Sequence, residues 1–158
     1  GSKAGSHREA GYAAALAAAG IAPDPRWVHR GENLVQTGAE GMAALLALPA
    51  ERRPTAVACV SDLIAVGAIN TAAAAGLVVG RDLAVTGYDD SAMAQFLHPP
   101  LTSVRQPISE VGRALVRLLL DRLSPEPAAP QGVLLRPALI VRSSSDFVRQ
   151  SETAGYAQ

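Results

Sequence analysis

The sequence is poor in the residues and motifs from which catalytic and metal sites are usually built. Its one cysteine, Cys59, lies in the apolar stretch "AVACV", which excludes a disulfide framework and disfavours a metal site. The three histidines are scattered, without the spacing of a metal pair or of a partner for a nucleophile. Neither a P-loop nor a dinucleotide-binding glycine motif occurs, so the glycines indicate helix stops and turns. We therefore expect no enzymatic activity, no cofactor and no metal.

Balanced charge and short apolar runs limit the partners of the chain. Lysine plus arginine and aspartate plus glutamate each number 14, so no net field attracts phosphate groups. We therefore do not expect this segment itself to bind nucleic acid. No apolar run is long enough to span a bilayer, and the N-terminus has no signal-peptide pattern. These features predict a cytoplasmic domain that makes no contact with a membrane.

The order of the expected elements predicts an α/β fold. Each of the first three expected helices is followed by a residue that ends helices. These residues are Gly20, Pro49 and Gly76 in chain order. Strands and helices alternate, which predicts a parallel sheet flanked by helices on both faces. No strand precedes the first helix, so the first unit lacks its strand. In chain order we expect a helix over 7–19, a strand at 27–28, helices over 35–48 and 62–75 separated by a strand over 55–60, strands over 83–86 and 101–104, a helix over 111–123, and an extended pair at 132–137 and 138–144.

Acidic and polar residues follow two of these strands. The stretch "VTGYDD" ends an apolar strand on Gly-Tyr and then places Asp89 and Asp90 at its end. Ligands bind at the carboxyl ends of strands in open parallel sheets, so these acids are candidates for recognition, although both would also suit a turn. Ser61 and Asp62 follow "AVACV" and are suited to cap the next helix, where a carboxylate also meets the helix dipole favourably.

Several linked motifs carry a family resemblance. In this order and at these spacings, the chain contains "HREAGYAAALAAAGI", "RPTAVACVSDLIAVGAINTAAAAGLVVGRDLAVTGYDD", "HPPLTSVRQP" and "LIVRSS". Together they resemble the C-terminal half of the effector-binding domain of LacI/GalR-family transcription regulators. The resemblance covers roughly residues 7–144 and implies a fold similar to type I periplasmic binding proteins. Such proteins have two α/β subdomains, joined by crossing segments, with a small-molecule site in the cleft between them.

The resemblance also implies a domain organisation. Residues 1–148 would form part of the sensor domain, in which 108–123 would return to the N-terminal subdomain, and 149–158 would form a flexible tail. The partner subdomain, the first strand and the DNA-binding helix-turn-helix would be absent from this chain. In the family, the helices that match 35–48 and 62–75 and the segment that matches 91–100 also form a dimer interface, so the resemblance implies a homodimer.

Site residues follow from the resemblance position by position. Asp89 matches the family's ligand-binding acid, and Arg8 matches the arginine of its "R..GY" motif, whose planar fork suits paired oxygens. Ser61 matches a ligand-contacting polar residue, and Gln106 lies where a segment crosses between subdomains. Asn33 departs from the family, because its position is commonly an aromatic residue that stacks on the ligand. The expected ligand-binding set is therefore Arg8, Asp89, Ser61, Gln106, Asn33 and Ser2, although a helix arginine, a capping serine and a loop amide are also ordinary structural residues.

The resulting hypothesis is the ligand-sensing part of a transcription regulator. Its effector would be a sugar or a similar polar metabolite, and operator DNA would bind only through the missing N-terminal domain. The alternative is a periplasmic solute-binding protein of a transport system, which would share the fold and the cleft. A third possibility is an α/β module with an unrelated role.

Overall fold

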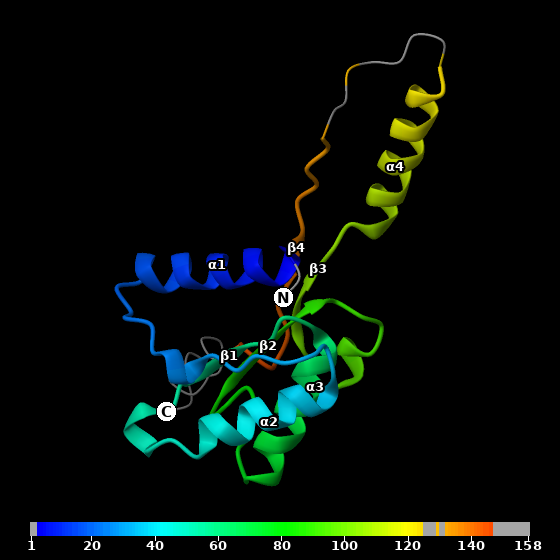
Figure 1. The fold of residues 1–158 in the computed structure, drawn as a ribbon. Coiled ribbons are helices and arrows are strands. Elements are labelled where there is room, and N and C mark those ends of the chain that lie inside the picture. The colour runs from blue at the N-terminus through cyan, green and yellow to red at the C-terminus, as the bar shows by residue number, and fades with distance from the viewer. Residues whose placement is uncertain (1–2, 125–128, 130–131, 147–158) are drawn as a thin grey trace, which may run out of the picture.

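A four-stranded mixed sheet forms the centre of the protein (Figure 1). The structure is a computed structural model and describes residues 3–124, 129 and 132–146. The first three strands are parallel and the fourth is antiparallel to the third. This arrangement confirms the predicted α/β fold and adds one antiparallel edge strand. The strands are β1 (Ala56–Ala58), β2 (Ala84–Asp89), β3 (Thr102–Arg105) and β4 (Ala138–Ile140), in the spatial order β1-β2-β3-β4.

Two helices cover one face of this sheet. Helices α2 and α3 pack together against this face, whereas α1 stands apart from the sheet and α4 extends away from it (Figure 1). No helix within the described ranges is long and apolar enough to cross a membrane. The helices are α1 (Lys3–Ala18), α2 (Val35–Leu46), α3 (Asp62–Ala74) and α4 (Ile108–Arg122), with short 3-10 helices η1 (Pro25–Trp27), η2 (Ala50–Arg52) and η3 (Ala94–Phe96).

The core lies between α2, α3 and the sheet. Ala65 and Ala72 of α3 are fully buried, as are Val85 of β2 and Leu101 just before β3. Their burial removes apolar surface from water and fixes α3 against the sheet. Small residues on α3 permit this close packing, and Gly76 ends the helical segment with a φ of 82°, the left-handed conformation that glycine adopts readily.

Two glycines allow α2 and α3 to cross at short range. A Cβ atom added at Gly38 would lie 1.9 Å from the backbone oxygen of Ile64, and one at Gly67 would lie 1.9 Å from that of Val35. Any other residue would therefore push the two backbones apart. The crossing sets the position of the amino end of α3, which lies beside the carboxyl end of β1.

The strand predicted at 27–28 is wrong, because residues 25–27 form η1 instead. Asp24 accepts a hydrogen bond from the backbone N–H of Arg26 at 2.9 Å, and Pro25 takes the first helical position. The capped 3-10 helix forms instead of a strand because residues 27–28 have no neighbouring strand with which to pair.

Two other boundaries differ from the sequence expectation. Strand β2 continues beyond residue 86, because Gly87 and Tyr88 pair with Ser103 and Val104 of β3. Residues 132–137 are irregular, and only 138–140 of the expected final pair form a strand. The predicted tail, 149–158, lies outside the described residues.

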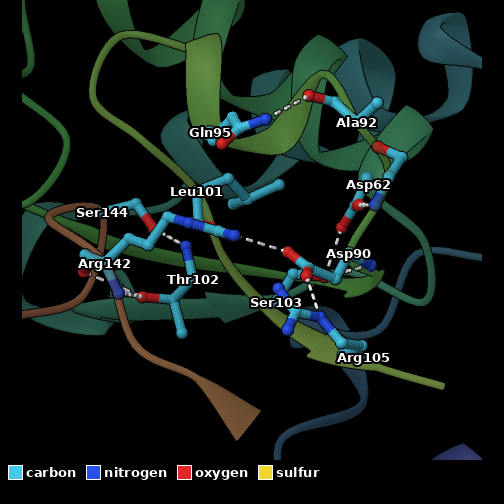
Figure 2. A network of polar contacts seen from close by, with 11 residues as sticks. Asp62, Asp90, Ala92, Gln95, Leu101, Thr102, Ser103, Arg105, Arg142 and Ser144 are labelled. Atoms are coloured by element: carbon cyan, nitrogen blue, oxygen red, sulfur yellow. Dashed lines mark hydrogen bonds and ion pairs between the residues drawn. The ribbon is translucent and has the colours of Figure 1, made fainter. Parts of the chain in front are cut away.

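A buried carboxylate ties the end of β2 to two arginines (Figure 2). Asp90 Oδ2 lies 2.6 Å from Arg105 Nε, and Asp90 Oδ1 lies 2.7 Å from Arg142 Nη2, while the Asp90 side chain is only 3% exposed. Burial raises the pKa of Asp90, but hydrogen bonds from Arg142 and Arg105 outweigh it, so the pKa lies below its usual value. Asp90 is thus a structural residue that joins β2, β3 and the segment after β4.

A second carboxylate holds the same turn from the side of α3. Asp62, which is 2% exposed, accepts hydrogen bonds at 2.6 Å from the Ser103 hydroxyl and from the Ser91 backbone N–H (Figure 2). The Ser103 hydroxyl in turn accepts a hydrogen bond from the Asp90 backbone N–H at 3.0 Å. The sequence expectation that Asp62 opens the helix is confirmed, and the structure adds that its carboxylate anchors the turn after β2.

The close helix crossing predicts that Gly38→Ala is strongly destabilising. We expect it to lower the free energy of unfolding by about 3 kcal/mol, because the new methyl group would clash with the backbone of α3. Urea denaturation followed by circular dichroism measures this change. The matched control is Gly11→Ala in α1, where a Cβ atom meets nothing within 4 Å. That variant should be as stable as wild type or about 1 kcal/mol more stable. Equal stability of Gly38→Ala and wild type would contradict the packing described here.

The lowered pKa of Asp90 predicts a pH-dependent contribution to stability. At pH 7 we expect Asp90→Asn to cost about 2 kcal/mol, less than breaking a fully buried pair, because Arg105 reaches solvent. A group with a lowered folded-state pKa stabilises the fold above its unfolded-state pKa and loses that contribution as pH falls through its folded-state value. The difference between wild type and variant should therefore shrink in acid. Urea titrations from pH 7 to pH 2 measure it, with Glu51→Gln as an exposed control; a difference constant over this range would contradict the prediction.

Candidate functional site

Polar side chains from five parts of the chain lie along the carboxyl edge of the parallel strands. Every predicted site residue within the described ranges lies there, whereas Ser2 lies outside those ranges. Three side-chain hydrogen bonds and one ring contact connect them into a continuous series with their neighbours Val60 and Tyr88. The residues are Arg8 on α1, Asn33 before α2, Ser61 after β1, Asp89 at the end of β2 and Gln106 after β3.

Asp89 is the last residue of β2 and has a strained backbone. Its φ is 106°, in a region that residues other than glycine rarely adopt. Its carboxylate is exposed and accepts a hydrogen bond from Gln106 Nε2 at 2.7 Å. The strain directs the Asp89 side chain toward the segment that leaves β3, and the Asp90 network next to it keeps the turn in place. The two adjacent acids therefore differ, with Asp90 buried in ion pairs and Asp89 facing solvent.

Arg8 reaches the sheet from α1 and is held at two points. Its Nη1 donates to the backbone oxygen of Val60 at 3.0 Å, at the end of β1. The centre of the guanidinium group lies 3.9 Å from the centroid of the Tyr88 ring, in the geometry of a cation–π contact. The half-buried guanidinium group thus lies between the ends of β1 and β2, where its remaining N–H groups are available to a ligand.

Ser61 and Asn33 form a pair beside Arg8. The Ser61 hydroxyl donates to Asn33 Oδ1 and accepts from the backbone N–H of Ile64 at 3.2 Å, which caps α3. Ser61 is 3% exposed, so its hydroxyl serves mainly to cap the helix and to anchor Asn33. Asn33 is exposed, and with its oxygen held by Ser61 the outward group is its NH₂ donor.

Tyr88 is a member of this series that sequence reasoning missed. Val85 and Gly87 face α3, so the two-residue period of a strand places Tyr88 on the opposite face, toward α1. That period was available from the sequence. The contact of Tyr88 with Arg8 could not be predicted, because the position of α1 relative to the sheet depends on tertiary packing.

The site has the chemistry of hydrogen-bonded binding. Arg8 supplies a cation, Asp89 an anion and Asn33 a neutral donor at one edge of the sheet. Burial raises the pKa of the nearby Cys59 thiol to about 12, so it is protonated at neutral pH and is a poor nucleophile. Within the described residues, no three histidine, cysteine or acidic side chains are grouped so that they could hold a metal ion.

Comparison with known proteins places this fold among bacterial regulators. HTH-type transcriptional repressor CytR of Escherichia coli strain K12 is 40% identical over 139 residues, which cover 88% of this chain and 40% of the relative. HTH-type transcriptional regulator CelR of Thermobifida fusca is 41% identical over 143 residues, covering 89% of this chain and 41% of the relative. The chain thus spans about 40% of the length of these curated relatives.

Solved structures agree with these sequence matches. A regulatory protein of the LacI family from Chloroflexus aggregans superposes with a TM-score of 0.87 at 40% identity, over 91% of this chain and 51% of that chain. A complex of the transcriptional regulator CelR with cellobiose gives a TM-score of 0.80 at 40% identity, over 89% of this chain and 42% of that chain. The sequence family described as the periplasmic binding protein-like domain matches residues 1–145. The chain therefore belongs to the periplasmic binding protein-like domain family, in the form that LacI-family transcription regulators contain.

Proposed function

We propose that the chain is the ligand-sensing part of a LacI-type transcription regulator and binds a small polar molecule, without catalysis, at the carboxyl edge of its sheet. The observation that carries this proposal is the pair of opposite charges, Arg8 and Asp89, held at the ends of adjacent strands. Both side chains are fixed by contacts to neighbouring residues, so a ligand meets a site that is already ordered. The relatives are transcriptional regulators, which supports regulation over transport as the role.

The donors and acceptors of the site suit a sugar or a similar polar metabolite. The planar fork of Arg8 matches two neighbouring oxygens, and the Asp89 carboxylate accepts hydrogen bonds from hydroxyl or amine groups. Asn33 adds a donor but no apolar surface, so the ligand is held by hydrogen bonds at this position rather than by stacking. The complex of CelR with cellobiose supports a sugar as the ligand class.

The proposed mechanism links this site to α4 through Gln106 and Pro107. Gln106 bonds to Asp89, and the chain enters α4 at Ile108. Several apolar side chains of α4 are exposed, which supports its assignment, with residues 108–123, to a second subdomain across a ligand cleft. Ligand binding then favours one closure of the two subdomains, to the extent that its affinity for the two closures differs.

In the whole protein this closure controls a DNA-binding domain on the N-terminal side. Operator DNA binds there, and the protein acts in the cytoplasm as a homodimer. The sensor chain itself carries no net charge, which suits a role that leaves phosphate contacts to another domain.

Asp89→Asn is the sharpest test of the proposed site. The substitution removes the charge but keeps the shape, and asparagine tolerates positive φ values. Because charge-assisted hydrogen bonds are stronger than neutral ones, we expect cellobiose affinity to fall by at least about tenfold. Titration of the ¹⁵N-labelled chain with cellobiose, followed by amide chemical shifts, measures this affinity.

The control for this titration is Asp82→Asn. Asp82 lies before β2, at the amino end of the strands, and its side chain pairs with Arg81. This variant should bind cellobiose as wild type does. Wild-type affinity in Asp89→Asn would show that the ligand does not use this carboxylate, and the proposed site would then be wrong.

A further inference from the structure

Tyr88 contacts the arginine of the proposed site, on the face of β2 opposite α3. Its neighbour Gly87 faces α3 so closely that an added Cβ atom would lie 2.3 Å from Asp62 Oδ1. The alternation of the strand therefore turns Tyr88 to the other face, where its half-buried ring meets Arg8. We propose that Tyr88 is a positioning residue that fixes the Arg8 guanidinium group for ligand binding, an inference that rests on the proposed function.

Two contacts restrain the guanidinium group. The Tyr88 ring, whose centroid lies 3.9 Å from the central carbon of the group, limits movement toward the sheet. The Val60 backbone oxygen, 3.0 Å from Nη1, fixes the rotation of the group along the sheet edge. A free arginine side chain has many rotamers, and ordering it during ligand binding would reduce affinity. Tyr88 and Val60 order it beforehand.

This arrangement also decides which ligand groups Arg8 can take. One face of the guanidinium group is covered by the ring, and Nη1 is held by Val60, so a ligand approaches the edge of the group rather than that face. An edge of a guanidinium group pairs with two oxygens in one plane, such as vicinal hydroxyls or a carboxylate. The same contact removes one face of the Tyr88 ring from stacking on a ligand. Asn33 also offers no apolar surface, so recognition here depends on hydrogen bonds.

A purely structural role would make Tyr88 a docking point for α1 and nothing more. Helix α1 has a second tie to the rest of the protein, because Glu9 forms an ion pair with Arg30 beyond η1. This pair provides a matched control. Breaking it loosens the attachment of α1 without touching the guanidinium group of Arg8, whereas removing the ring acts on the guanidinium group directly.

The test compares Tyr88→Phe, Tyr88→Leu and Glu9→Gln with wild type, using the Arg8 Nε–Hε signal in ¹⁵N spectra of the chain. A ring below the group shifts this proton upfield, so wild type, Tyr88→Phe and Glu9→Gln should show a shifted signal. In Tyr88→Leu the signal should move to the position of a solvated arginine, while the backbone amide spectrum confirms that the sheet is folded. An unmoved Arg8 signal in Tyr88→Leu would overturn the proposal.

Cellobiose titration of the same variants tests the consequence for binding. We expect Tyr88→Leu to bind about fivefold more weakly, the size of an exposed cation–π contact, and Tyr88→Phe to bind as wild type does. Weakening by Glu9→Gln to the same extent as by Tyr88→Leu would overturn the proposal, because attachment of α1 would then explain the effect. If cellobiose caused no shifts in wild type, the proposed sugar ligand would be contradicted, while the Arg8 signal would still decide the positioning role.

Discussion

The ion pairs of Asp90 are the interaction on which the geometry of the sheet edge depends. Asp90 follows the strained Asp89, and its carboxylate is shared between Arg105 at the end of β3 and Arg142 after β4. These contacts hold two parallel strands and the antiparallel edge strand at one point. A positive φ at a residue other than glycine persists only where its surroundings enforce it, and this network supplies that enforcement. The exposed carboxylate next in sequence is therefore presented by a rigid base.

The side chains of β2 alternate between the two faces of the sheet and therefore contact different parts of the molecule. Val85 and Gly87 face α3, where the first fills the core and the second allows the buried Asp62 to approach the backbone. Tyr88 faces α1 and receives Arg8. A single strand thus links the packed layer of α2 and α3 to the arginine of the site. The close crossing at Gly38 keeps that layer thin enough for α3 to begin beside β1.

Much of the fold followed from sequence pattern, because helix stops and apolar strands are local signals. Ser61 and Asp89 could be placed at one edge of the sheet because parallel strands have their carboxyl ends on the same side. The strand expected at 27–28 failed because pairing needs a neighbour, and a proline with a capping aspartate formed η1 instead. The antiparallel direction of β4 was not predictable from its own residues, since strand direction is set by the path of the chain. The role of Tyr88 depends on where α1 lies relative to the sheet, which no local pattern encodes.

The hydrogen bond between Gln106 and Asp89 affects the affinity of any ligand that binds the Asp89 carboxylate. Gln106 Nε2 lies 2.7 Å from Asp89 Oδ1, so one oxygen of this carboxylate already accepts a hydrogen bond from the protein's own amide. A carboxylate oxygen has two lone pairs, so a ligand that donates to it either shares it with Gln106 or displaces Gln106. In the second case the measured affinity is the difference between the two bonds rather than the full strength of the new one. The displaced amide belongs to the residue pair that leads into α4. A ligand that displaced the amide would therefore release one restraint on the connection to α4, whereas a ligand that shared the oxygen would leave this restraint in place.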